Sequence, residues 1–310
     1  MKKIFIDGKA GTTGLRIYER LADRNDVSLI LLSDEERKNT DARKKALNSC
    51  DIAFLCLPDD AAREAVSLIE NPDVVVIDAS TAHRTEAGWS YGFPELSKET
   101  EKNIRNSKRI ANPGCHASGF VALVYPLIEA GILSSDALLT CHSITGYSGG
   151  GKKMIADYGQ EGRDVLLNYP RQYGINQAHK HLKEMKFITG LENQPVFSPI
   201  VSDFYSGMEV TVPLFAKQLN DGYSIEDVKA TLKKKYNSNI VKYVDCADDS
   251  GFLSAGKLAG TDSMIVTVCG NDDRFILVAL YDNLGKGASG AAVECMNIVM
   301  GEDPEKGLVI

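Results

Sequence analysis

Residues 2–24, KKIFIDGKAGTTGLRIYERLADR, join a short apolar stretch to a longer amphipathic one through a glycine-rich turn. Residues 2–7 predict a first β-strand, and residues 12–24 predict a helix. The same alternation continues downstream, with apolar runs at 27–33, 51–58 and 74–80 and helical patterns at 43–48 and 59–70. Nearly continuous runs of Val, Ile and Leu between helices are typical of parallel strands covered on both faces. We therefore predict an α/β domain with a doubly wound, Rossmann-type sheet.

The turn itself carries three glycines, Gly8, Gly11 and Gly14, in a G-x-x-G-x-x-G pattern. A glycine lets the backbone approach a pyrophosphate closely, and the N–H groups of a helix N-terminus point at its charge. Thr12 and Thr13 can add hydroxyl donors. We expect these five residues to bind a dinucleotide. The alternative is a tight strand-to-helix turn without a ligand.

The pattern changes close to residue 113. A long apolar helix is predicted at 118–133, and later apolar segments alternate with polar or small residues, as in a sheet with one covered face. The later strands are predicted at 138–146, 207–215, 262–270 and 274–282, and a small-residue helix follows at 287–301. We expect a dinucleotide-binding domain formed by residues 1–113 and 284–310. Residues 114–283 are expected to form an α+β domain with a mostly antiparallel sheet, which serves catalysis, substrate binding and oligomerisation.

The composition limits the classes of function. The chain has 310 residues, 44% of them hydrophobic and 25% charged, which suits two ordinary domains. A net charge of −7 argues against a nucleic-acid partner. No apolar run reaches the roughly 20 residues that cross a bilayer, and the N-terminal MKKIFIDG does not resemble a secretion signal. Seven cysteines without a C-x-x-C pair favour a reducing, cytoplasmic location over disulfides or structural zinc.

The end of the second predicted strand bears on the choice of nicotinamide cofactor. An NAD-binding fold usually places an acidic residue there, on the ribose 2′-hydroxyl. Here Ser33 comes first and the basic Arg37 lies close behind, which suits the 2′-phosphate of NADP. Asp34 and Glu35 oppose that choice. We expect Ser33 and Arg37 to bind NADP, with solvated loop charges as the alternative.

Cys115 follows the turn formed by residues 112–114 and lies where the long apolar helix begins. At a helix N-terminus the backbone dipole and the N–H groups favour thiolate over thiol, and only the thiolate attacks a carbonyl carbon. The other six cysteines lie in strands, loops or helices without such a field. We therefore predict that Cys115 is a nucleophile rather than a small buried side chain.

A thiol nucleophile needs a group that moves protons. His179 and His181 lie in the segment NQAHKHLKEM, followed by Glu184, whose carboxylate can orient one imidazole. Spacing alone does not decide which of the two histidines moves the proton. His116 adjoins the cysteine, but consecutive residues on a helix do not face each other. The H-x-H pair could hold a metal, but no further ligands are evident, so we expect none.

Eight motifs occur in order along nearly the whole chain: IDGKAGTTGLRI, LCLPDDAAREAV, DASTAHR, YGFPEL, NPGCHASG, GYSGGGKK, HKHLKE and DNLGKGASGAA. Together they resemble the N-acetyl-gamma-glutamyl-phosphate reductases of the short, type 2 form. That family is similar to aspartate-semialdehyde dehydrogenase in chemistry and domain plan. The resemblance implies NADPH-dependent reduction of N-acetyl-L-glutamyl 5-phosphate to the 5-semialdehyde and phosphate, through a cysteine thioester, in arginine biosynthesis.

The resemblance also implies roles for individual residues. Cys115 matches the family's nucleophile, and the glycine turn matches its cofactor loop. The two histidines and the glutamate match an H-x-H-x-x-E element. Asn283 and Gly287 match a stretch that approaches the nicotinamide side of the cofactor.

Two further segments suit the anionic groups of such a substrate. The glycine-rich stretch with Ser148, Gly149 and Lys152 offers backbone N–H groups and a cation, with a flexible loop as the alternative. Arg84 follows the strand at 74–80, at the end where α/β proteins collect ligands, and can hold a carboxylate with two hydrogen bonds. Its alternative is an ion pair with a neighbour.

Two other functions are compatible with the residues. Aspartate-semialdehyde dehydrogenase uses the same thioester chemistry on a shorter substrate. A non-catalytic NAD(P)-binding redox sensor would use Cys115 as a switch, but it would not require the histidine and glutamate element. The apolar strands of the second half favour a homo-oligomer, either a dimer or a tetramer. We expect a small-molecule acyl phosphate as the partner, and neither nucleic acid nor a membrane.

Overall fold

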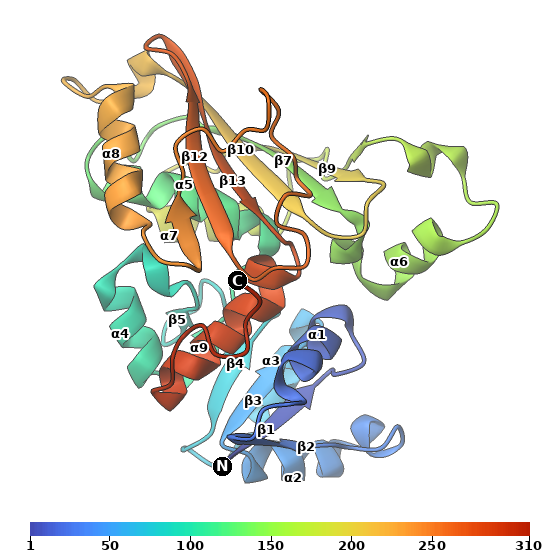
Figure 1. Ribbon diagram of the computed structural model, residues 1–310. Helices are drawn as coiled ribbons and strands as arrows, with labels where there is room; N and C mark the ends of the chain where they lie inside the picture. The colour runs from blue at the N-terminus through green and yellow to red at the C-terminus, as the bar shows by residue number, and fades with distance from the viewer. The chain divides into compact units, whose positions relative to one another are not determined.

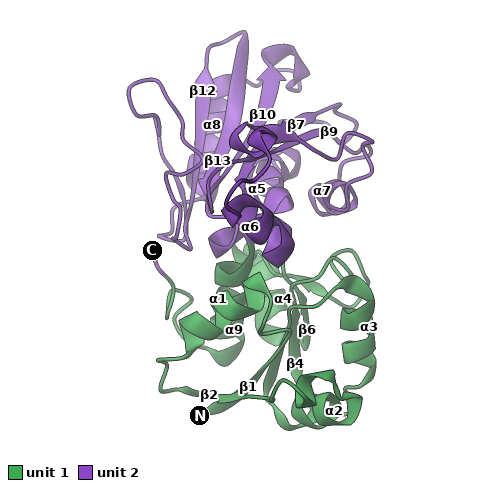
Figure 2. Ribbon diagram, turned by 90° about the vertical axis from the view of Figure 1, so that its right-hand side faces the viewer, with its two compact units in different colours: residues 1–114, 288–308 green, residues 115–287, 309–310 purple.

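The computed structural model describes all 310 residues (Figure 1). It divides into two compact units, which are described separately here (Figure 2). Unit 1 contains Met1–Gly114 and Ala288–Leu308, and unit 2 contains Cys115–Gly287 and Val309–Ile310. The boundaries expected from the sequence, after residues 113 and 283, lie one and four residues before those of the compact units.

Unit 1 is built on a six-stranded parallel sheet with the strand order β2-β1-β3-β4-β6-β5. The strands are β1 (Lys2–Asp7), β2 (Val27–Ile30), β3 (Ile52–Leu55), β4 (Val75–Asp78), β5 (Ser90–Tyr91) and β6 (Arg109–Ala111). The helices are α1 (Thr12–Leu21), α2 (Thr40–Ser49), α3 (Asp59–Ser67), α4 (Lys98–Asn106) and α9 (Gly290–Met300). β3 and β4 are buried at every residue, as expected for strands with helices on both faces.

Alternate residues of β1 pack into the two separate cores of unit 1. Ile4 and Ile6 belong to a core that includes residues of α1, α4 and α9. Phe5 belongs to the opposite core, with residues of α2 and α3. This alternation follows from the two-residue period of a strand, and it gives the doubly wound arrangement that the sequence predicts.

Asp26, in the loop between α1 and β2, holds the segment that follows α9 in unit 1. Its carboxylate accepts from Arg24 at 2.7 Å and pairs with Lys306 at 2.9 Å. Hydrogen bonding to Arg24, with Lys306 beside it, holds the pKa of Asp26 well below its usual range. The ion pair therefore stabilises the folded state most fully above the unfolded pKa of about 3.9, and this contribution is lost as the pH falls towards the lower folded pKa.

We expect Asp26→Asn to unfold more easily than wild type at neutral pH, and the difference to shrink below about pH 4. The substitution removes a pH dependence of the free energy of unfolding that is at most about 1.4 kcal/mol per pH unit. Denaturant unfolding between pH 3 and 7 measures this, with the exposed neighbour substitution Asp23→Asn as the control. A difference that stays constant with pH would contradict the assignment.

Unit 2 is built on a seven-stranded mixed sheet with the order β11-β12-β13-β10-β7-β9-β8. The strands are β7 (Thr140–Gly146), β8 (Arg171–Gln172), β9 (Val196–Ser202), β10 (Met208–Phe215), β11 (Val241–Tyr243), β12 (Met264–Gly270) and β13 (Arg274–Tyr281). Four of the six pairings are antiparallel, and β7–β9 and β11–β12 are parallel. The expectation of a mostly antiparallel sheet is confirmed.

Four helices accompany this sheet: α5 (Cys115–Glu129), α6 (Gly151–Gly159), α7 (His181–Thr189) and α8 (Ile225–Lys235). The apolar helix α5 packs against β10 and β13 and also contacts α7 and α8. The packing of α5 against α7 brings the residue at the start of each helix, Cys115 and His181, into one region of unit 2. None of the helices is both long enough and apolar enough to cross a membrane.

Candidate active site

The glycine turn after β1 has the geometry that its sequence predicts. Gly8 has φ = 86°, and a Cβ there would overlap the carbonyl oxygen of Cys56. Gly11 is the N-cap of α1, and no side chain caps that helix. Gly14 is buried within the first turn. The backbone at Cys56, just after β3, thus approaches this turn as closely as glycine permits.

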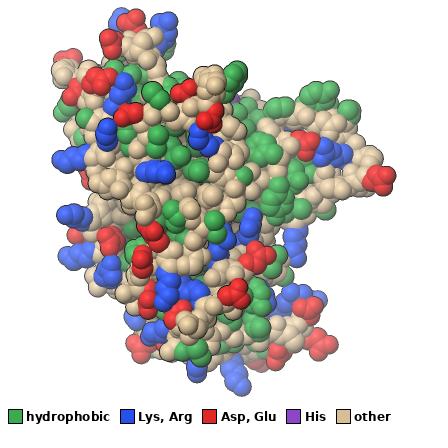
Figure 3. Space-filling model, in the orientation of Figure 1, with side chains coloured by type: hydrophobic (Ala, Val, Ile, Leu, Met, Phe, Trp, Pro, Cys, Tyr) green, Lys and Arg blue, Asp and Glu red, His purple; other side chains and the backbone are tan.

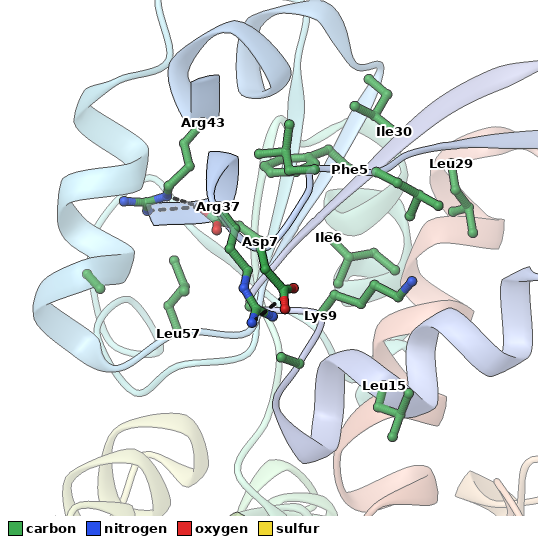
Figure 4. Close-up of a pocket in the computed structure, with 16 residues that line it drawn as sticks. Phe5, Ile6, Asp7, Lys9, Leu15, Leu29, Ile30, Arg37, Arg43 and Leu57 are labelled. Atoms are coloured by element: carbon green, nitrogen blue, oxygen red, sulfur yellow. Dashed lines mark hydrogen bonds and ion pairs between the residues drawn. The ribbon is translucent and has the colours of Figure 1, made fainter. Parts of the chain in front are cut away.

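A cavity of about 400 Å³ adjoins this turn (Figure 4). Gly8 and Lys9 line it at the turn, and Asp34, Arg37 and Arg43 also line it. Next to the turn, the hydroxyl of Thr12 is buried without a hydrogen-bond partner. A buried hydroxyl at an uncapped helix N-terminus suits an anionic oxygen of a pyrophosphate, so these residues fit a dinucleotide.

The residues predicted to select the cofactor interact locally. Ser33 and Glu36 exchange hydrogen bonds, the Ser33 N–H donating at 2.9 Å and the Ser33 Oγ accepting at 3.2 Å. Arg37 pairs with Asp34 at 3.1 Å at the edge of the cavity. Sequence reasoning missed Arg43, which reaches the cavity from α2 and donates to Asp7 at 2.9 Å.

Cys115 is the first residue of α5, as predicted, and it is partly exposed. The buried Tyr281 of β13 spans the first turn: its hydroxyl donates to the Cys115 carbonyl at 2.5 Å and accepts from the Gly119 N–H at 3.1 Å. A Cβ at Gly287 would lie 3.2 Å from the Cβ of Cys115 and 3.3 Å from the Tyr281 ring. Tyr281 and Gly287 therefore enclose the backbone that carries the thiol.

Tyr281→Phe should loosen the first turn of α5. It removes the hydroxyl partner of the Cys115 carbonyl and of the Gly119 N–H, and losing such a hydrogen bond costs about 0.5–1.5 kcal/mol of folding free energy. Tyr236→Phe is the matched control, because that buried hydroxyl donates to the Ala122 carbonyl farther along α5 at 2.8 Å. We expect both variants to lose stability in denaturant unfolding, but only Tyr281→Phe to change the alkylation rate of Cys115. Equal alkylation rates in the two variants would contradict this role.

His116 belongs to the same site, so its exclusion on helical spacing was wrong. One donor atom from each of Cys115, His116 and His181 lies within 4.8 Å of the others. The His116 ring is buried between two hydroxyls, with Nδ1 2.7 Å from Ser143 Oγ and Nε2 2.6 Å from the Tyr173 hydroxyl. Burial lowers the pKa of His116 to about 3, so this imidazole is neutral at physiological pH. The spacing rule failed because both residues lie at the end of the helix, where α7 and β7 pack around them.

The H-x-H-x-x-E element surrounds the start of α7. His181 is buried, and its backbone N–H donates to Nδ1 of the partly exposed His179 at 3.3 Å. The two rings meet edge-on with centroids 4.8 Å apart. Burial, together with the charge of Lys180, lowers the pKa of His179. Glu184 is buried in the first turn of α7, one turn beyond His181.

The predicted anion-binding loop is held by Asn283. Ser148 is buried, its Oγ accepts from the Asn283 side chain at 3.0 Å, and its N–H donates to the Tyr205 carbonyl. The oxygen of the same amide accepts from the Gly207 N–H at 2.9 Å. Asn283 therefore orders two loops of unit 2. Gly149 lies against the same amide, and Lys152 is exposed on α6.

Arg84 lies in unit 1 with its side chain buried. Its Nε donates to the Asn112 carbonyl at 2.9 Å, and a terminal nitrogen donates to the Ala79 carbonyl at 3.0 Å. Asn112 is three residues before Cys115 in the chain.

Known proteins match the chain over most of its length. The model of the semialdehyde dehydrogenase NAD-binding domain matches residues 3–104, and that of the semialdehyde dehydrogenase dimerisation domain matches residues 115–283. N-acetyl-gamma-glutamyl-phosphate reductase 2 of Nostoc sp. is 46% identical over 99% of both chains. The chain belongs to the N-acetyl-gamma-glutamyl-phosphate reductase family. Two further members are the reductases of Allorhizobium ampelinum, 46% identical over 96% of this chain and 98% of that one, and Brucella ovis, 45% identical over 97% and 99%.

Solved structures place this reductase family member in the same fold group. Aspartate semialdehyde dehydrogenase II of Vibrio cholerae has a TM-score of 0.74 at 19% identity, over 97% of this chain and 98% of that one. The enzyme of Candida albicans, solved with NADP, has a TM-score of 0.67 at 17% identity, over 97% and 98%. The predicted fold class is confirmed. The family is one of oxidoreductases, and its NAD-binding domain indicates a nicotinamide cofactor.

Proposed function

We propose that the protein reduces N-acetyl-L-glutamyl 5-phosphate to N-acetyl-L-glutamate 5-semialdehyde and phosphate, as a step of arginine biosynthesis. The observation that carries the proposal is the position of Cys115 at the start of α5. Its sulfur lies within 4.8 Å of a ring nitrogen of His116 and of one of His181. Full-length relatives named as N-acetyl-gamma-glutamyl-phosphate reductases support this choice of substrate.

The proposed chemistry begins with the Cys115 thiolate. Its sulfur bonds to the acyl carbon and the bond from that carbon to the phosphate oxygen breaks, which gives a thioester and free phosphate. The backbone N–H of Cys115 or of His116, at the start of α5, is assigned to the oxyanion, at roughly 3 kcal/mol per donor. When bound, the nicotinamide supplies the hydride that reduces the thioester. His179 or His181 moves the proton as the aldehyde leaves and the thiolate re-forms.

The two anionic groups of the substrate are assigned to the residues predicted for them. Lys152 is exposed at the start of α6, where its ammonium can meet a phosphate. Ser148 and Gly149 form the turn before it, which Asn283 holds. Arg84 is assigned to the carboxylate. If substituting either Lys152 or Arg84 by Ala leaves the KM for the acyl phosphate unchanged, that assignment fails.

NADP is proposed as the cofactor, and Gly287 and Asn283 are proposed to lie on its nicotinamide side. The basic residues Arg37 and Arg43 line the cavity beside the glycine turn and support a 2′-phosphate. Arg37→Ala should lower the ratio of kcat/KM with NADPH to that with NADH by about tenfold, because a charge-assisted hydrogen bond is worth about 1.5–3 kcal/mol. Lys38→Ala is the control, because Lys38 is the exposed residue next to Arg37. An unchanged ratio in Arg37→Ala would mean that Arg37 does not set the preference for NADPH over NADH.

The oligomeric state and the location complete the proposal. The match of residues 115–283 to a dimerisation domain supports a homo-oligomer, and we propose a dimer or a tetramer. The seven free cysteines support the cytoplasm as the location. Acidic and basic side chains are interspersed on the face seen in Figure 3, which suits a small-molecule substrate better than nucleic acid.

The deciding assay is the reverse reaction. With phosphate present, N-acetylglutamate semialdehyde should reduce NADP in the presence of the enzyme, and omitting phosphate should abolish the signal. Aspartate semialdehyde is the competing substrate. A higher kcat/KM with aspartate semialdehyde would replace the proposed substrate with the shorter one.

A further inference from the structure

The start of α5 and the start of α7 bring three soft donor atoms together in unit 2. Cys115 offers a thiolate and is partly exposed, while His116 and His181 offer imidazole nitrogens and are buried. The three atoms lie within 4.8 Å of one another. We propose that Cys115, His116 and His181 form a binding site for Zn²⁺, and that the bound ion inhibits the enzyme.

The donor set fits zinc in type and number. Zn²⁺ prefers thiolate and imidazole ligands, and sites with three protein ligands keep a fourth position for water. With Zn–S near 2.3 Å and Zn–N near 2.0–2.1 Å, tetrahedral ligand atoms lie roughly 3.5 Å apart. The three side chains therefore need to close by about an ångström, which small changes of side-chain torsion can provide.

The surroundings of His116 supply an orienting contact for one of its nitrogens. Its two nitrogens now meet Ser143 and Tyr173. A metal on one nitrogen replaces one of these hydrogen bonds and leaves the other, which fixes the tautomer and the ring orientation. Such outer contacts are the usual support of metal-bound histidines, and losing one typically weakens metal affinity 10- to 100-fold.

Zinc at this site competes with the proposed chemistry. The thiol proton goes to solvent when the metal binds, and the sulfur lone pair that would attack the acyl phosphate is held by the ion. The ion also holds a nitrogen of His181 while the nucleophile is blocked. The inhibition rests on the proposed role of Cys115, whereas the binding of the metal does not.

The first experiment titrates the metal-free full chain with Co²⁺ as a spectroscopic substitute for zinc. We expect one ion per chain and an absorption band from thiolate-to-cobalt charge transfer. Cys115→Ser should abolish the band, and His116→Gln and His181→Gln should each weaken binding at least tenfold. Cys246→Ser, at an exposed cysteine, is the control and should change nothing. A band that survives Cys115→Ser, or an affinity unchanged by His181→Gln, would overturn the proposal.

A second measurement does not depend on variants of the ligands. Zn²⁺ should slow the alkylation of Cys115 by iodoacetamide in the wild-type protein, as followed on the peptide that contains it, and a chelator should restore the rate. Ser143→Ala should weaken the protection about tenfold while the thiol stays in place. Undiminished alkylation with Zn²⁺ present would overturn the site. A protein that binds zinc but reduces no acyl phosphate would refute the proposed function alone.

Discussion

Cys115→Ser should lower kcat for acyl-phosphate reduction at least about a thousandfold, while leaving the affinity for the nicotinamide cofactor within a factor of about three. The reason is chemical: a serine hydroxyl is far less ionised than a thiol at neutral pH, so far less of the nucleophilic form is present to attack the acyl carbon. The residues proposed to bind the cofactor, in the glycine turn, at Ser33 and Arg37, and at Asn283 and Gly287, do not include this sulfur. Steady-state kinetics measure the first effect and fluorescence titration with NADPH the second.

The control for this substitution is Cys141→Ser. Cys141 is buried in β7, and burial raises the pKa of its thiol, so it is not a nucleophile. We expect Cys141→Ser to cost stability and to retain turnover. Turnover that survives Cys115→Ala would end the proposed mechanism.

The histidine pair gives the second large effect. Replacing the histidine that moves the proton should lower kcat by about 10²–10⁴, and it should remove the corresponding limb of the pH–rate profile. The structure places a nitrogen of His181 within 4.8 Å of the Cys115 sulfur, and burial lowers the pKa of His179. His179→Asn and His181→Asn are therefore compared. The histidine whose replacement removes the limb of the pH–rate profile is the proton carrier. Replacing the other histidine should lower kcat tenfold or less.

His142→Asn is the matched control, since that imidazole is exposed on β7. It should leave both kcat and the pH profile unchanged. If both His179→Asn and His181→Asn keep wild-type kcat, no histidine of this element takes part in the reaction.

Local sequence patterns were enough to predict the first four strands of the sheet of unit 1. The apolar runs at β1, β3 and β4 are continuous because helices bury both faces, and this continuity is visible without the structure. The strands β5, β6, β8, β9 and β11 were not foreseen, and neither was the parallel pairing of β7 with β9. Each depends on partners far apart in the chain, and a strand of two to seven residues does not itself specify its neighbour.

The same contrast holds for the candidate site. Cys115 and the glycine turn are recognisable because a helix N-terminus is a local feature. Tyr281 and Arg43 were missed and His116 was set aside, since each reaches its site through tertiary packing: Tyr281 from a distant strand, His116 against α7, and Arg43 from α2. A buried tyrosine in a sequence resembles any other core aromatic residue until its hydroxyl partner is known.

The thioester on Cys115 is the central claim, and mass spectrometry of the intact chain and of its peptides tests it most directly. The enzyme is mixed with N-acetylglutamyl phosphate in the absence of any nicotinamide, quenched in acid and digested. The account predicts one N-acetylglutamyl group per chain, on the peptide that contains Cys115, and its disappearance once NADPH is added. An enzyme that turns over while this peptide stays unmodified, or that carries the acyl group on another residue, would contradict the account.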